Sequence, residues 1–275
     1  MPIFSRRQLR QSLGQRYLRD TVVGQTSGSW GTQAGSANIV DLAQADYTAS
    51  GEQLYQRHYM RLLGSAGLIQ DLRVASFNTG SGAFVAAQTL ATTIFSGMPF
   101  EVHVNDPKEK DRALDDVIRQ VRVRREVPLW ATDGLHVYSL GPDVFDVVGV
   151  RFFSDPASSL NRGEAGVSWW KYETTQTGNE LRISPSLLAS YQLAIDAVLA
   201  VSLGAGDLAT VNLPDEDWIL SGAGARLLWL LEQRSPGQEN GVYKERRKEL
   251  AREYTRLSAR FQPRASRRLM LDEVW

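Results

Sequence analysis

The sequence predicts an α+β fold. It indicates a β-sandwich-like or barrel-like central region with an inserted helix, followed by a C-terminal antiparallel helical hairpin and an extended C-terminal arm. Apolar and polar residues alternate with a period of two through much of residues 36–205, and turn signals recur at short spacing, as strands of a sandwich require. The period becomes helical within that region and again after residue 206. No fixed-period repeat indicates a solenoid.

Length and composition set limits on the class of protein. The chain has 275 residues, of which 43% are hydrophobic and 23% charged, as is typical of globular proteins. It contains no cysteine, which excludes disulfides, thiolate metal sites and a cysteine nucleophile. The longest strongly apolar run, Leu227–Leu231, is far shorter than a membrane span, and the basic start lacks the apolar run of a secretory signal. We therefore expect no membrane partner.

Residues 1–35 are expected to form a helix and a flexible link. Residues 4–19 carry apolar side chains at helical spacing, interrupted by arginines, which predicts a short amphipathic helix. The following stretch is rich in Gly, Ser and Thr, a composition typical of a connector.

The β-rich region spans residues 36–205 in this interpretation. Its first clear strand, "LYQRHYMRLL", places basic and aromatic side chains on one face, namely Tyr55, Arg57, Tyr59 and Arg61. Two strands flank the turn "NTGSG", and further strands are expected up to "NELRIS". Residues 190–203 fit both a strand and a helix. We expect a strand, because Gly204 and Gly206 end the segment and strands precede it.

A helix is expected within this region at residues 106–125. Asp106 or Asn105 is placed to cap it, and Pro107 suits its first turn. Its apolar stripe comprises Leu114, Val117, Ile118 and Val121.

Residues 206–262 are expected to form the helical hairpin. Pro214 and the acids at 215–217 suit the start of the first helix, and Ser235–Gly237 breaks it. The second helix, at about 239–262, has an apolar stripe made of Tyr243, Leu250, Tyr254, Leu257 and Phe261. After Pro263 the chain is expected to continue as a basic arm at 263–275.

Charge is concentrated at the C-terminal end. From Lys244 to Arg268 there are ten basic and three acidic residues, although the whole chain has a formal charge of zero. On the second helix, Arg252, Arg256 and Arg260 recur every four residues beside a ridge of three glutamates, so the helix is largely self-neutralised. In the arm, Arg264, Arg267 and Arg268 have no nearby acid, yet the apolar residues that follow favour a protein groove over DNA.

Catalytic motifs are not evident. The three histidines are scattered over different predicted strands, and neither a GxSxG nor a Walker-type motif occurs. "GAGDLA" at Gly204–Ala209 matches GxGxxG/A, but Pro214 follows too soon for the helix that a dinucleotide site needs, so we expect a turn. We therefore expect a non-enzymatic protein with no cofactor and no metal site. Of the adjacent Trp169 and Trp170, one should be in the core and the other at an interface.

The order of these stretches resembles the head-to-tail adaptor (connector) proteins of tailed bacteriophages over nearly the whole chain. The stretches are "SRRQLRQSLG", "SANIVDLA", "LRVASFNTGSGAFVAAQ", "MPFEVHV", "DPKEKDRALDDVIRQV", and "LATVNLPDEDWILSGAGARLLWLLEQ" with the Arg-rich helix and arm. The large β-rich region departs from many small adaptors, which are nearly all helical. This departure leaves open the alternative that the protein is a neck stopper or tail-terminator component. A nucleic-acid-binding protein that uses the basic arm is the other alternative.

The resemblance implies a virion protein of the phage neck, assembled in the host cytoplasm. Twelve copies would form a ring below the portal protein and join it to a downstream neck or tail protein, while DNA passes through the lumen without specific binding. The residues expected to bind the portal are Arg260, Arg264, Arg267, Arg268, Leu269, Leu271 and Trp275. The candidates for the subunit interface are Arg57, Arg61, Trp170, Arg252 and Arg256.

Overall fold

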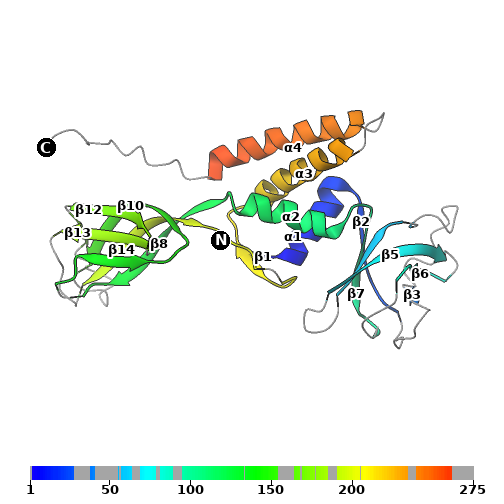
Figure 1. Cartoon of the computed structure of the whole chain (residues 1–275), viewed down its shortest axis with the longest axis horizontal. Coiled ribbons are helices and arrows are strands. Elements are labelled where there is room, and N and C mark those ends of the chain that lie inside the picture. Colours follow the sequence, from blue (N-terminus) through cyan, green and yellow to red (C-terminus); the bar gives the residue numbers. More distant parts are fainter. Residues whose placement is uncertain are drawn as a thin grey trace. The chain divides into compact units, whose positions relative to one another are not determined.

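Figure 1 shows a computed structural model of the chain, which confirms the predicted α+β class. The structure describes residues 2–27, 38–40, 55, 57–63, 69–78, 81–88, 95–132, 134–153, 164–167, 169–176, 178–184, 191–204, 206–234 and 240–261. The chain forms two compact units. Unit 1 comprises Met1–Ile118 and Ser202–Ser258, and unit 2 comprises Arg119–Val201 and Ala259–Trp275. The expected β-rich region at 36–205 is therefore divided between two units.

Unit 1 combines a sheet with helices. Its strands are β1 (Ile3–Ser5), β2 (Thr21–Gln25), β3 (Asn38–Val40), β4 (Tyr59–Leu63), β5 (Ile69–Asn78), β6 (Ala83–Ala86), β7 (Pro99–His103) and β15 (Thr210–Asn212). Its helices are α1 (Arg6–Ser12), the π-helix η1 (Leu13–Leu18), α2 (Pro107–Ile118), α3 (Glu216–Arg234) and most of α4 (Asn240–Phe261). Six strands form an antiparallel sheet in the order β2-β7-β4-β5-β6-β3, and β1 pairs with β15.

The six-stranded sheet of unit 1 has one apolar and one polar face. Met60 and Leu62 of β4 lie in a buried apolar cluster with Phe100 and Val102 of β7. Because successive side chains of a strand point to opposite faces, the residues between them form the polar face. The predicted alternation is therefore confirmed within β4 itself. Tyr55 was placed on the wrong face: it precedes the strand, which begins at Tyr59, and its buried side chain lies in the same apolar cluster as Met60 and Leu62.

The N-terminal helix forms where it was expected. Ser5 caps α1 in a capping box with Gln8, and the chain continues as η1 until Arg19, which takes a left-handed conformation (φ 53°). Gly14 of η1 lies against Thr21, whose hydroxyl oxygen would be only 1.9 Å from an added Cβ. Glycine is therefore required where η1 meets β2.

The inserted helix is shorter than predicted. Asp106 caps α2 by accepting a hydrogen bond of 2.8 Å from the amide of Lys108, but the helix ends at Ile118. The expected residues 119–125 are not helical, because β8 begins at Arg122. From there the period is two, with Val123 buried and Arg124 exposed.

The predicted antiparallel helical hairpin is confirmed as α3 and α4. Asp215 caps α3 by accepting from the amide of Trp218 at 3.0 Å. Along the hairpin, the Trp218 indole donates to Ser258 at 2.8 Å, and near the other end Glu232 pairs with Arg247 at 2.8 Å. α3 is buried on several sides because it also packs against α2.

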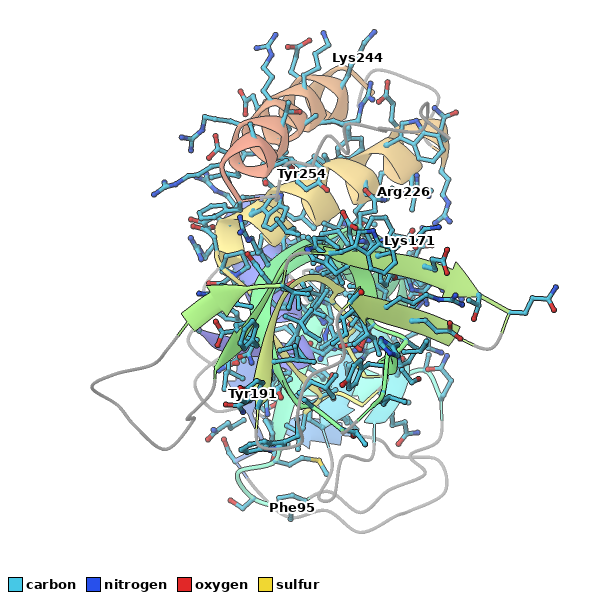
Figure 2. All side chains as sticks on the ribbon, turned by 90° about the vertical axis from the view of Figure 1, so that its left-hand side faces the viewer. Phe95, Lys171, Tyr191, Arg226, Lys244 and Tyr254 are labelled. Atoms are coloured by element: carbon cyan, nitrogen blue, oxygen red, sulfur yellow. The ribbon has the colours of Figure 1, made fainter. Side chains whose placement is uncertain are left out.

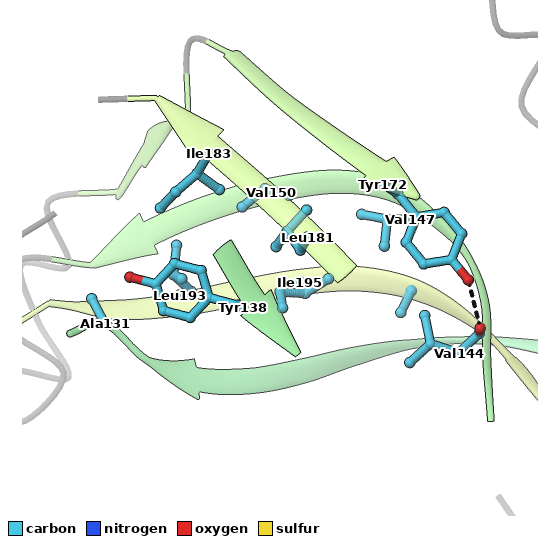
Figure 3. Packing of buried hydrophobic residues seen from close by; sticks show 11 residues of the cluster. Ala131, Tyr138, Val144, Val147, Val150, Tyr172, Leu181, Ile183, Leu193 and Ile195 are labelled. Atoms are coloured by element: carbon cyan, nitrogen blue, oxygen red, sulfur yellow. Dashed lines mark hydrogen bonds between the residues drawn. The ribbon is translucent and has the colours of Figure 1, made fainter. Parts of the chain in front are cut away.

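Unit 2 is a β-sandwich-like body. Its strands are β8 (Arg122–Trp130), β9 (Val137–Leu140), β10 (Val144–Phe153), β11 (Glu164–Gly166), β12 (Trp169–Thr175), β13 (Gly178–Ser184) and β14 (Gln192–Ala200). They form a four-stranded sheet, β11-β10-β14-β8, and a three-stranded sheet, β12-β13-β9. Side chains of both sheets share one apolar core (Figure 3), which the Tyr172 hydroxyl spans by donating to the carbonyl of Val144 at 2.8 Å. The strand expected at 190–203 is confirmed as β14.

We predict that Gly222→Ala destabilises unit 1 by about 1–3 kcal/mol, as overpacking does. An added Cβ would lie 2.7 Å from the Tyr254 ring of α4 and 3.0 Å from Val117 of α2, so two helices would have to move. Gly241→Ala is the matched control, because a Cβ there meets nothing within 4 Å. Urea unfolding measures both changes, and equal midpoints for the two variants would contradict this packing.

Candidate functional site

The densest cluster of ionisable side chains lies in unit 1, between the polar face of the sheet and the helices. We call it the interlayer network. It comprises Arg10, Asp20, Arg61, Asp71, Glu101, His103, Lys110, Asp111 and Asp207.

Arg10 is the centre of this network. Its side chain is fully buried, and its Nε and Nη2 donate to the two carboxylate oxygens of Glu101 at 2.8 and 3.1 Å. Its Nη1 donates to Asp111 at 3.0 Å and lies 2.6 Å from the carboxylate of Asp207. One guanidinium thus joins α1, β7, α2 and the segment that follows β14, which suits its five fixed donors.

Arg61 holds a second part of the network. Its Nε and Nη2 donate to Asp71 at 2.6 and 3.0 Å, and its Nη1 donates to Asp111 at 2.5 Å. Only 3% of its side chain is exposed, so the expectation that Arg61 faces a neighbouring subunit is corrected. Buried charge is stable only when paired, and Arg61 has its pairs within unit 1.

His103 joins Glu101 to Lys110. Its Nε2 lies 2.9 Å from Glu101, and its Nδ1 lies 2.9 Å from the Thr21 hydroxyl and 3.1 Å from Lys110 Nζ. Lys110 also donates to Asp20 at 2.5 Å. Because an amine donates toward Nδ1 and a carboxylate accepts at Nε2, the arrangement favours the neutral tautomer with its proton on Nε2.

The same surroundings shift three pKa values. Burial lowers the pKa of His103, and the nearby charge of Lys110 acts in the same direction, while Glu101 opposes them. Burial also lowers the pKa of Lys110, against the attraction of Asp20. Burial alone would raise the pKa of Glu101, but hydrogen bonds from His103 and Arg10 lower it to about 2.

The Gly204–Ala209 segment has a structural role. Its residues 206–209 form a turn, as expected, in which the amide of Ala209 donates to the carbonyl of Gly206 at 3.0 Å, and carbonyl groups of the segment accept hydrogen bonds from the start of α1. The amides of Arg6 and Arg7 donate to the carbonyls of Ala209 and Asp207 at 2.9 and 3.0 Å. The Arg6 guanidinium donates to the carbonyl of Gly204 at 2.8 Å.

The geometry of the network supports a structural role. Arg10, Glu101, His103 and Lys110 are fully buried and bonded to one another, so their donors and acceptors are engaged within the fold. The described residues also contain no group of side chains that could hold a metal ion. The ion pairs and hydrogen bonds of the network hold the helices against the sheet.

The predicted portal-binding residues fall largely outside the described part of the chain. Arg260 lies at the end of α4, exposed, with its guanidinium 5.1 Å from the centre of the Phe261 ring. The other members lie outside the described residues, namely Arg264, Arg267, Arg268, Leu269, Leu271 and Trp275.

The subunit-interface candidates differ in exposure. Arg252 and Arg256 are exposed on α4, where Arg256 donates to Glu253 at 3.0 Å through Nε. Arg57 is exposed and has a left-handed backbone (φ 69°). The two tryptophans are the reverse of the expectation, because Trp170 packs against the core of unit 2 whereas Trp169 is 51% exposed.

Sequence comparison finds no protein-family model and no curated protein that matches the chain. Among the described helices, none is long and apolar enough to cross a membrane.

We predict that Arg10→Met lowers the free energy of unfolding by about 3–5 kcal/mol, because it leaves buried carboxylates without their partner. Arg16→Met is the matched control. Arg16 pairs with Glu216 and Asp217, but half of its side chain is exposed, so its loss should cost about 0–1 kcal/mol. Chemical denaturation of both variants tests this. A loss for Arg10→Met no larger than that of the control would contradict the structural role of the network.

We predict that acid destabilises the protein in two stages. Below the ordinary pKa of 6.5 the unfolded chain protonates His103 whereas the folded chain resists it, so stability falls with pH. Between pH 4.5 and about pH 2 the unfolded chain protonates Glu101 whereas the folded chain resists it, so stability falls further. Thermal unfolding from pH 8 to pH 2 measures both stages, and His103→Gln should flatten the decline between pH 6.5 and 5. An unchanged decline in that variant would assign the effect to other groups.

Proposed function

We propose that the chain is a structural virion protein, a head-to-tail adaptor that forms a ring below the portal. It would extend the DNA channel and join the capsid to the neck or tail. The observation that carries the proposal is the exposure of large aromatic side chains in unit 2. Trp130, Phe145 and Trp169 are 57%, 59% and 51% exposed, although the unit has its own apolar core. Exposed tryptophans of this kind are typical of surfaces that a partner covers.

The position of these aromatics fits assembly into a ring. Trp130 ends β8 and Trp169 begins β12, and among the described strands each of these lies at the edge of its sheet. A closed ring uses a heterologous interface, in which two different surfaces of one copy meet neighbours. Two aromatic positions on different sheets supply two such surfaces. We propose Trp169, in place of Trp170, as the interface residue, and we retain Arg57, Arg252 and Arg256 as candidates.

Unit 1 would supply the stiff part of each copy. Its charge network fixes α1 and α2 on the sheet, and α3 connects α2 to α4. In this proposal α4 leads to the portal-binding arm, where Arg264, Arg267 and Arg268 contact the portal and the apolar residues after them occupy a groove. The protein would function in the phage neck after assembly in the host cytoplasm, with a neck or tail protein on its other side.

We predict that the purified chain forms rings, alone or with the portal protein of its phage, and native mass spectrometry with electron microscopy detects them. A variant that lacks residues 264–275 should keep its fold and lose portal binding. Trp169→Ser should weaken association between copies, whereas Trp229→Ser, which alters an exposed tryptophan of α3, serves as the control. Absence of rings under both conditions, or normal portal binding by the truncated chain, would contradict the proposal.

A further inference from the structure

The outward side of α4 carries a continuous row of basic residues. Lys244, Lys248, Arg252, Arg256 and Arg260 follow one another at intervals of four, and all are exposed. We call this row the basic ridge. At a rise of about 1.5 Å per residue it extends for roughly 24 Å. Figure 2 shows Lys244 on the side of α4 away from α3, whereas Tyr254 lies between the two helices.

The expectation that α4 is largely self-neutralised is corrected, because its acids leave much of this charge uncompensated. Glu245 pairs with Lys248 at 2.9 Å, Glu249 pairs with Arg246 at 2.8 Å, and Glu253 pairs with Arg256. For Lys244, Arg252 and Arg260, the described part of the chain contains no acidic side chain in ion-pair contact. Residues 240–261 contain seven basic and three acidic residues, which gives the helix a net positive charge of four, and one of these charges, on Arg247, is paired with Glu232 of α3.

The residues beside the basic ridge are small or acidic, with no large apolar side chain exposed among those that the structure describes. Gly241, Ala251, Thr255 and Ala259 are exposed next to it, Glu245, Glu249 and Glu253 also border it, and the leucines of α4 that have a described position are buried. Protein interfaces generally need large apolar or aromatic anchors at their centre. Surfaces that bind nucleic acid are more polar and much more positive. The composition of the basic ridge therefore favours a phosphate backbone over an acidic protein.

We propose that the basic ridge of α4 binds the phosphate backbone of double-stranded DNA without reading its sequence. The ammonium and guanidinium groups pair with phosphates, and the small side chains let the duplex approach the helix closely. Binding releases counterions, so affinity falls steeply as salt rises. This inference goes beyond the adaptor function and does not rest on ring formation, since one copy carries the whole ridge.

The test measures binding of the full chain to a fluorescent duplex at several salt concentrations. In the ridge variant, Lys244, Arg252 and Arg260 are replaced by alanine. In the control variant, Arg16, Arg226 and Arg234 are replaced by alanine, which removes the same charge from exposed residues elsewhere in unit 1. Circular dichroism checks that both variants fold. Both triple variants are also made in the chain that lacks residues 264–275, which separates α4 from the arm.

We expect binding of the wild type at low salt, with a negative slope of log affinity against log salt. Loss of three phosphate contacts should reduce the magnitude of that slope by about 2–3 and the low-salt affinity at least about tenfold, with and without the arm. The control should change affinity by less than about threefold, and an unrelated duplex should bind equally. Equal losses in the two variants, no duplex binding at low salt, or binding to polyglutamate in place of DNA would overturn the proposal. None of these outcomes affects ring formation, so the two proposals fail separately.

Discussion

The buried pair of Arg10 and Glu101 is the interaction on which unit 1 depends. One face of the six-stranded sheet is apolar, and its side chains pack against one another. The other face carries charged side chains, which need partners of opposite charge. Arg10 of α1 supplies the positive charge that pairs with Glu101, and it contacts Asp111 of α2 and Asp207 at the same time. Because removal of charges from water is costly, the arrangement is stable only when each group is paired. The pairing therefore fixes where the helices lie on the sheet.

Local features of the fold could be predicted from the sequence. The alternation in β4, the strand at β14, the Asp106 cap and the α3–α4 hairpin each depend on residues that are neighbours in the chain. The predicted end of α2 was wrong because the residues of "VRVRRE" also suit a helix. Burial of Val123 on one face of β8 favours the strand. Trp169 and Trp170 were reversed because alternation shows that two neighbours face opposite sides, but not which side is the core.

The interlayer network could not be predicted, because the contacts that join its N-terminal members to the rest span about ninety residues or more, as between Arg10 and Glu101 or Asp20 and Lys110. Arg10 and Glu101 are 91 positions apart, and each alone resembles an ordinary surface charge. A weak signal existed in β7, where Glu101 and His103 alternate with Phe100 and Val102. When charged residues alternate with apolar residues along one strand, they lie on opposite faces, and a second layer packed on the charged face buries these charges. Two sets of arginines thus differ in their surroundings: Arg10 and Arg61 are buried and paired within unit 1, whereas Arg252 and Arg260 are exposed on α4.

Hydrogen exchange of the native protein, measured by mass spectrometry in the wild type and in Arg10→Met, tests the central role of Arg10 most directly. Segments that depend on one interaction open together as a unit. The account predicts that α1, β7 and α2 lose protection together in the variant, while β12 and β13 of unit 2 exchange as in the wild type. Loss of protection confined to α1, with β7 and α2 unchanged, would contradict it.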